Sequence, residues 1–162
     1  MIVEKEEQLK YLYAFKEGKI KRGLGIGNEL DNWVLYKRGS FNIIVGLDNV
    51  GKTNFMLWYF LALSIKHNIK WLLWSGENSA GQLTRDLIQM YSQTKLNYLS
   101  KSKIEEYNTK IGEWFTFVSN KKMYNHKELL KIFKESNCDA GVIDPFTGLN
   151  HDRRVNQYER NY

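Results

Sequence analysis

The chain has 162 residues, which is enough for one domain with a buried core and too few for two complete domains. Its 43% hydrophobic and 26% charged residues, with a single proline, exclude an extensively disordered chain. The formal net charge of +6 permits a polyanionic partner. The lysines are dispersed, however, so charge alone does not identify that partner as nucleic acid.

Two features predict the compartment. The longest apolar run, Phe55 to Leu63, is too short to cross a bilayer, and acidic residues occupy the N-terminus where a signal peptide would be basic and then apolar. The single cysteine, Cys138, excludes an internal disulfide and a zinc site built from paired cysteines. We therefore expect a cytoplasmic protein without a membrane partner.

The N-terminal part predicts a lead-in helix followed by a connector. Apolar residues recur at helical spacing between residues 3 and 16, and Gly18 ends the pattern. Residues 19–27 are basic and glycine-rich, and residues 28–34 follow before the turn-like residues 37–40, as expected of a connector onto the core. We therefore assign residues 1–36 to an N-terminal helix and connector, and residues 37–162 to the core domain.

The core begins with a strand, a glycine loop and a helix. Residues 41–45 are a short β-rich apolar run that meets Gly46, and residues 52–66 have the length and apolar density of a helix. A second strand is expected over residues 71–74. Ser79 and Gln82 then form the sequence pattern of a capping box, which opens a helix through Tyr91.

Two further strands are expected, with helices before and between them. Ser102 with Glu105 repeats the capping pattern, residues 114–118 predict a strand, and Asn125 with Glu128 opens a helix that continues to residue 135. A last apolar run, residues 140–143, ends in Asp144 and Pro145. The alternation predicts an α/β fold with a mostly parallel sheet flanked by helices.

Residues 46–53 match the complete phosphate-binding pattern of glycine, four variable residues, glycine, lysine and threonine, between a predicted strand and a predicted helix. Backbone N–H groups of such a loop can surround phosphate oxygens at the positive end of the helix. This context makes an accidental glycine turn the weaker interpretation. The residues expected to bind the nucleotide are Gly46, Leu47, Asp48, Asn49, Val50, Gly51, Lys52, Thr53 and Asn54.

Individual roles follow from the chemistry of these side chains. Lys52 is expected to reach the β- and γ-phosphates, and the Thr53 hydroxyl to bind Mg²⁺, which prefers oxygen ligands shared with phosphates and water. Asp48 and Asn49 are expected to shape the turns of the loop. The cofactor expected is therefore Mg²⁺, with ATP as the substrate.

Two carboxylates are expected at the edge of the sheet where the phosphates would lie. Asp144 ends a predicted strand and is assigned to Mg²⁺. An apolar run that ends in aspartate is common, so this assignment depends on the phosphate-binding pattern of residues 46–53. Glu77 follows another predicted strand and is assigned as the general base that activates water. The alternative role of Glu77 is that of a helix-start acid before Ser79.

Three segments carry a resemblance to the RecA-like motor domains of the DnaB and Twinkle type of replicative helicase. Residues 37–41 resemble the lead-in to the loop, residues 75–83 resemble the segment of the catalytic glutamate, and residues 143–146 resemble the Walker B segment of the phage and mitochondrial primase-helicase branch. The motifs occur in the family order. The chain departs from the family in its loop residues 47–50, where a proline or smaller residues are usual.

The resemblance implies a RecA-like core whose C-terminal part is missing, because the family continues beyond the Walker B segment with a sensor strand, DNA-contacting loops and an arginine finger. It implies that Lys52 and Glu77 are catalytic, that the partners of the full-length protein are ATP and single-stranded DNA, and that it is a hexamer in bacterial or phage-infected cytoplasm. Beyond Asp144, the charges interpreted as surface or interface groups are Arg153, Arg154 and Arg160. His151, beside Asp152, is interpreted as a solvated loop residue rather than a ligand.

Other classes remain open. A GTPase should carry an Asn-Lys-x-Asp segment, and residues 120–123 lack its aspartate, while a small-molecule kinase needs an arginine-rich lid that is not seen. A nucleotide-binding or assembly module without efficient turnover, and another RecA-like ATPase such as a recombinase or KaiC-like protein, stay as alternatives.

Overall fold

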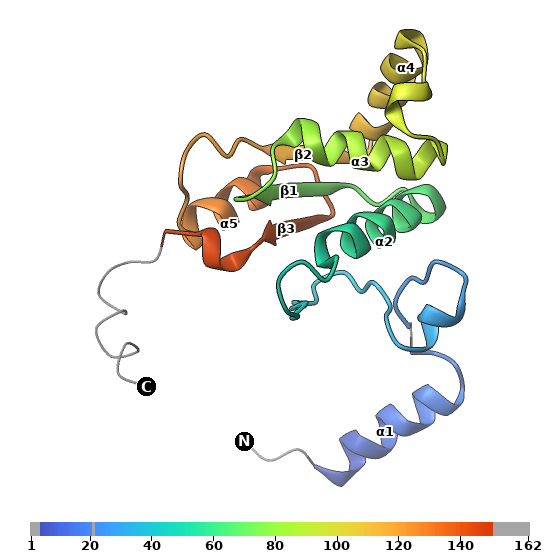
Figure 1. Ribbon diagram of the computed structural model, residues 1–162. Coiled ribbons are helices and arrows are strands. Elements are labelled where there is room, and N and C mark those ends of the chain that lie inside the picture. Colours follow the sequence, from blue (N-terminus) through green and yellow to red (C-terminus); the bar gives the residue numbers. More distant parts are fainter. Residues whose placement is uncertain (1–3, 21, 151–162) are drawn as a thin grey trace. The chain divides into compact units, whose positions relative to one another are not determined.

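The computed structural model describes residues 4–20 and 22–150 (Figure 1). The chain divides into two compact units, the first ending at Ser40 and the second beginning at Phe41. This division lies four residues after the boundary expected between residues 36 and 37. Each unit is described separately below.

The first unit contains helix α1 (Lys5–Lys16) and a short 3-10 helix, η1 (Glu29–Asn32). The expected start of α1 at residue 3 lies outside the described residues. The connector closes on itself through an antiparallel bridge between Leu24 and Tyr36. Inside it, the Asp31 carboxylate accepts hydrogen bonds from the N–H groups of Ile26 and Gly27, both at 2.7 Å.

The second unit is built on a parallel sheet of three strands: β1 (Trp71–Ser75), β2 (Phe115–Val118) and β3 (Ala140–Asp144). Their order is β2-β1-β3, so β1 is central. Trp71 pairs with Phe115 on one side and with Ala140 on the other. The α/β class with a parallel sheet is therefore confirmed.

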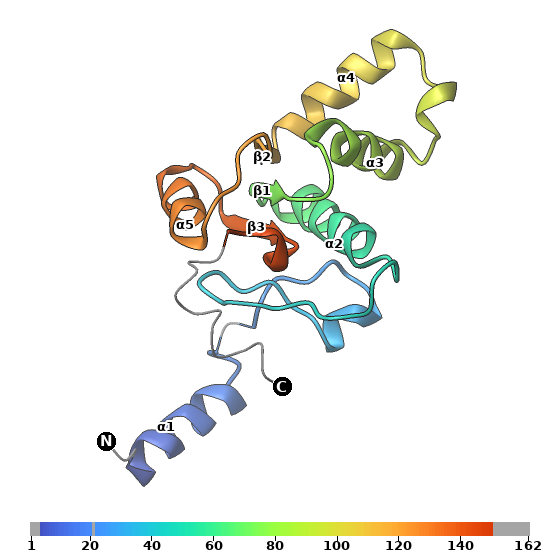
Figure 2. The same cartoon turned by 60° about the vertical axis from the view of Figure 1, so that its left-hand side comes forward.

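Four helices accompany the sheet: α2 (Lys52–His67), α3 (Ala80–Ser92), α4 (Lys101–Gly112) and α5 (His126–Glu135). Two short 3-10 helices, η2 (Leu96–Tyr98) and η3 (Phe146–Gly148), complete the described elements. Helices α2 and α3 lie on one side of the sheet and α5 on the other (Figure 2). The sheet is thus flanked on both faces, as the sequence predicts.

Side chains of the central strand alternate between these two layers, because successive residues of a strand point to opposite faces. The Trp71 ring stacks on Phe60 of α2 with ring centroids 4.0 Å apart. On the other face, the buried Trp74 packs in a cluster with Leu129 of α5 and with Leu149. Both faces of β1 are therefore core, and every residue of this strand is buried.

Two of the three predicted capping boxes are present. Ser79 with Gln82 caps α3, and Asn125 with Glu128 caps α5. The pKa of Glu128 lies below its ordinary value. The main cause is the hydrogen bond that its carboxylate accepts from the Asn125 N–H, and the second is the hydrogen bond from Lys122. Each box satisfies backbone N–H groups that a helix start leaves without an intrahelical partner.

The cap predicted at Ser102 is wrong. Helix α4 begins two residues earlier, and its N-cap is Ser100, whose hydroxyl accepts a hydrogen bond from the Lys103 N–H at 3.3 Å. Ser102 therefore lies within the first turn. A serine hydroxyl suffices as a cap without an acidic residue three positions later, so the Ser102–Glu105 pattern indicated the wrong serine.

The strand predicted over residues 41–45 is also wrong. This segment has no strand assignment, and its apolar side chains are exposed, reaching 88% for Phe41 and 87% for Val45. A strand requires a neighbour for its backbone hydrogen bonds. Within the described residues, β3 pairs only with β1 and offers no such pairing to residues 41–45.

In the part of the chain that the structure describes, no helix has both the length and the apolar character needed to span a bilayer.

The packing of α5 on β3 predicts the effect of one substitution. A Cβ atom at Gly141 would overlap the ring of Phe133, so Gly141→Ala forces the ring or the strand to move. We expect the free energy of unfolding to fall by about 1–3 kcal/mol, the usual range for overpacking. Chemical denaturation measures it, with Gly112→Ala as the matched control, because a Cβ there meets open space. Equal stability of the two variants would contradict the described packing.

Candidate functional site

The carboxyl ends of β1 and β3 lie side by side. Ser75 pairs with Asp144 in the strand register, and the Gly76 N–H donates a hydrogen bond to the Asp144 carbonyl at 3.0 Å. The loop that carries Glu77 therefore leaves the sheet directly beside Asp144. Parallel strands place their carboxyl ends at one edge, so both predicted carboxylates belong to the same edge.

The amino end of α2 meets this edge through one side-chain contact. The Thr53 hydroxyl donates a hydrogen bond of 2.8 Å to the Asp144 carboxylate, across 91 residues of sequence. Both residues are half-buried. The structure thus brings together the two residues that the sequence assigns to Mg²⁺.

The loop before α2 has the backbone geometry of a tight turn. Gly51 is the N-cap of α2 with a φ of 83°, a left-handed conformation that favours glycine, and Asn49 has a φ of 59°. No side chain caps this helix, unlike α3 and α5. An anion is a suitable partner for uncapped N–H groups at the positive end of a helix.

Lys52, the first residue of α2, folds back over the loop. Its Nζ donates hydrogen bonds to the carbonyls of Gly46 at 2.7 Å and of Leu47 at 2.6 Å. A Cβ at Gly46 would lie 3.3 Å from the Lys52 Cδ, so the glycine leaves room for this side chain. The ammonium group is therefore held at the mouth of the loop by two carbonyls.

The other predicted loop residues are open to solvent. The residues from Gly46 to Gly51, with Asn54, are exposed, including Asp48 and Val50. Asn54 lines an open hollow of about 360 Å³ together with Asp86, Gln89 and Met90 of α3. The loop is accordingly accessible along its length.

Glu77 lies in an exposed bend between β1 and α3. Among the described residues, its side chain makes no hydrogen bond or ion pair, in contrast to Asp144. Sequence reasoning missed two residues that hold this bend. Ser75 and Asn120 bond to the backbone of Asn78, and only their position at strand ends could have drawn attention to them.

The oxygens of Thr53 and Asp144 fit a hard divalent cation, which takes its remaining ligands from phosphates and water. Across residues 4–20 and 22–150, no three His, Cys, Asp or Glu side chains gather into a metal-binding cluster. The donor set is thus suited to Mg²⁺ bound together with a nucleotide and unsuited to a cation held by protein side chains alone.

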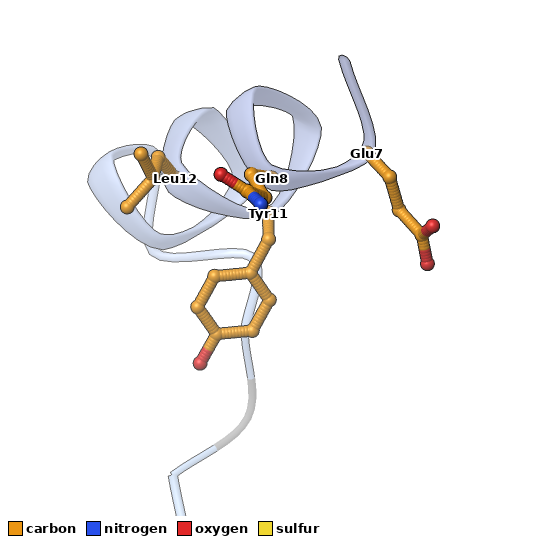
Figure 3. A pocket seen from close by; sticks show the side chains of 4 residues that line it. All are labelled: Glu7, Gln8, Tyr11 and Leu12. Atoms are coloured by element: carbon orange, nitrogen blue, oxygen red, sulfur yellow. The ribbon is translucent and has the colours of Figure 1, made fainter. Parts of the chain in front are cut away.

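A second hollow, of about 400 Å³, lies along one face of α1 and is lined by Glu7, Gln8, Tyr11 and Leu12 (Figure 3). All four side chains come from one helix and are exposed. This hollow brings no charged groups from different elements together, so it does not compete with the edge of the sheet as a site.

The predicted surface or interface charges Arg153, Arg154 and Arg160 lie outside the described residues. The predicted loop residue His151 also lies outside them. The fold and the site define an α/β chain with a glycine loop at the edge of a parallel sheet. Comparison with protein-family models gives no match, and comparison with curated proteins gives no similar protein.

The Thr53–Asp144 hydrogen bond predicts a loss of stability on substitution. Thr53→Val keeps the shape and removes the donor, so we expect the free energy of unfolding to fall by about 1.5–3 kcal/mol, as for a hydrogen bond to a charged group. Chemical denaturation checks this. The control is Thr84→Val in α3, where another half-buried threonine has no described hydrogen bond. Similar losses in both variants would contradict a contribution from this contact.

Proposed function

We propose that this chain is a RecA-like P-loop domain that binds ATP with Mg²⁺, and that it serves as the ATP-hydrolysing motor of a replicative DNA helicase. The observation that carries the nucleotide-binding part is the 2.8 Å contact between Thr53 and Asp144. It joins a phosphate-binding loop to a carboxylate at the end of a parallel strand, which is the arrangement that ATP–Mg²⁺ requires.

The chain's own residues suit the binding of a triphosphate. Uncapped N–H groups at the start of α2 would donate hydrogen bonds to phosphate oxygens, and Lys52 would exchange its two carbonyl partners for the β- and γ-phosphates. Thr53 and Asp144 would hold Mg²⁺, which neutralises charge on the β- and γ-phosphates when it is bound. The exposure of the loop allows a nucleotide to enter from solvent.

Hydrolysis requires a base beside the γ-phosphate, and Glu77 lies at the same edge as Asp144. In the proposed reaction the Glu77 carboxylate accepts a proton from water as the water oxygen bonds to the γ-phosphorus, and the bond to the bridging oxygen of ADP breaks. The exposed bend leaves Glu77 open to water. Because no described contact holds its carboxylate, a binding module with weak turnover is the second candidate function.

The helicase part of the proposal rests on the resemblance of residues 37–41, 75–83 and 143–146 to the DnaB and Twinkle type of motor. It implies single-stranded DNA as a partner and a hexamer in the full-length protein. The net charge of +6 is compatible with a polyanionic partner.

Removing the loop ammonium tests nucleotide binding. Lys52→Ala should weaken ATP–Mg²⁺ binding about ten- to hundredfold, because a charge-assisted contact to phosphate is lost. Calorimetric titration measures the affinity, and circular dichroism confirms the fold. Lys66→Ala, an exposed lysine at the other end of α2, is the matched control. Unchanged affinity in folded Lys52→Ala would reject the phosphate-binding assignment.

Removing the base separates the two candidate functions. Glu77→Gln should keep ATP affinity and lower the rate of phosphate release about a hundredfold, since the amide keeps the shape and loses the basicity. The control is Glu105→Gln, an exposed glutamate of α4. A Glu77→Gln rate equal to that of the wild type would return Glu77 to a helix-start role and favour the binding module.

A further inference from the structure

The position of the Glu77 carboxylate depends on the backbone of its bend. Its side chain has no hydrogen bond or ion pair with any described residue, so nothing but the path of residues 76–79 directs it. A general base must lie within hydrogen-bond reach of the water that it deprotonates. Groups that hold this backbone therefore determine whether Glu77 can act.

Three contacts hold the bend to its own strand, to β3 and to α3. The Gly76 N–H donates to the Asp144 carbonyl at 3.0 Å, and the Asn78 N–H donates to the buried Ser75 hydroxyl at 3.0 Å. At its far end the Ser79 N–H donates to Gln82 Oε1 at 2.8 Å, inside the capping box of α3. The N–H groups at positions 76, 78 and 79 are thus all engaged.

The fourth contact comes from the neighbouring strand β2. Asn120 lies two residues beyond the end of β2, and its Nδ2 donates a hydrogen bond to the Asn78 carbonyl at 3.2 Å. The peptide groups on both sides of Asn78 are thereby fixed, one by Ser75 and the other by Asn120. Since β2 and β3 flank β1, the bend is tied to both of its neighbouring strands.

Asn120 itself is exposed, and within the described part of the chain its side chain has this one hydrogen bond. It adds nothing to the core. Lys121 beside it is equally exposed, and Lys122 is engaged with Glu128 and with the Tyr124 ring, 5.1 Å from the ring centroid. The amide of Asn120 is therefore the group of this loop that reaches the bend of Glu77.

We propose that Asn120 is a positioning residue for Glu77, acting by clamping the Asn78 carbonyl from the end of β2. This inference rests on the proposed function, because it assigns Asn120 a role in ATP hydrolysis at the same site. Without the clamp, the peptide that follows Asn78 keeps only the hydrogen bond from the Ser79 N–H to Gln82. Its carbonyl side can then tilt, and the Glu77 carboxylate samples positions away from the attacking water. Misplacement of a catalytic group costs rate rather than substrate affinity.

The test is single-turnover hydrolysis of ATP–Mg²⁺ by the 162-residue chain. Asn120→Ala should lower the rate about tenfold and leave ATP affinity within about twofold of the wild type. Ser75→Ala, which releases the other side of Asn78, should act in the same direction. Lys121→Ala keeps the backbone N–H that bonds to Ser119 and should hydrolyse at the wild-type rate. Hydrogen exchange should rise in the peptide covering residues 76–79 of Asn120→Ala.

A double variant separates positioning from other roles. In a Glu77→Gln background, Asn120→Ala should cause no further loss, since the group that it positions is already gone. Two results would overturn the inference: a tenfold loss that persists in this background, or an Asn120→Ala rate equal to that of the wild type. The proposed function would still stand in both cases, provided that Glu77→Gln alone lowers the rate. Full activity of Glu77→Gln itself would overturn both.

Discussion

The hydrogen bond between the Thr53 hydroxyl and the Asp144 carboxylate is the contact on which the candidate site depends. It connects the first turn of α2 to the carboxyl end of β3, two elements separated by 91 residues. The loop of residues 46–51 is exposed and belongs to no strand, so this contact fixes where the loop meets the sheet. It brings the glycine loop and a carboxylate to one edge, while the stacking of Phe60 on Trp71 holds the body of α2 on the sheet.

Parallel topology supplies the rest of the arrangement. Because β1, β2 and β3 run in the same direction, the segments that follow them gather at one edge, where Glu77, Asn120 and Asp144 are found. The buried central strand is the rigid support for these exposed loops. The proposed catalytic residue Glu77 and the proposed positioning residue Asn120 thus stand in loops whose ends are fixed by the sheet.

The sequence predicted the elements whose signals are local. Apolar runs located β1, β2 and β3 to within a residue or two, and side-chain caps located α3 and α5, because these signals depend on neighbouring residues alone. The strand at residues 41–45 failed because pairing requires a neighbour that its own sequence does not specify. The contact from Asn120 to Asn78 spans 42 residues and depends on the fold, so no spacing rule could reveal it.

The central claim is that ATP–Mg²⁺ binds where the loop of α2 meets β3. A crystal structure of the chain with a non-hydrolysable ATP analogue and Mg²⁺ tests it most directly. The account predicts the triphosphate on the backbone of residues 46–53, Lys52 turned from the Gly46 and Leu47 carbonyls to the phosphates, and Mg²⁺ between Thr53 and Asp144. A nucleotide bound elsewhere, with the Thr53–Asp144 hydrogen bond intact and Lys52 still on its carbonyls, would contradict it.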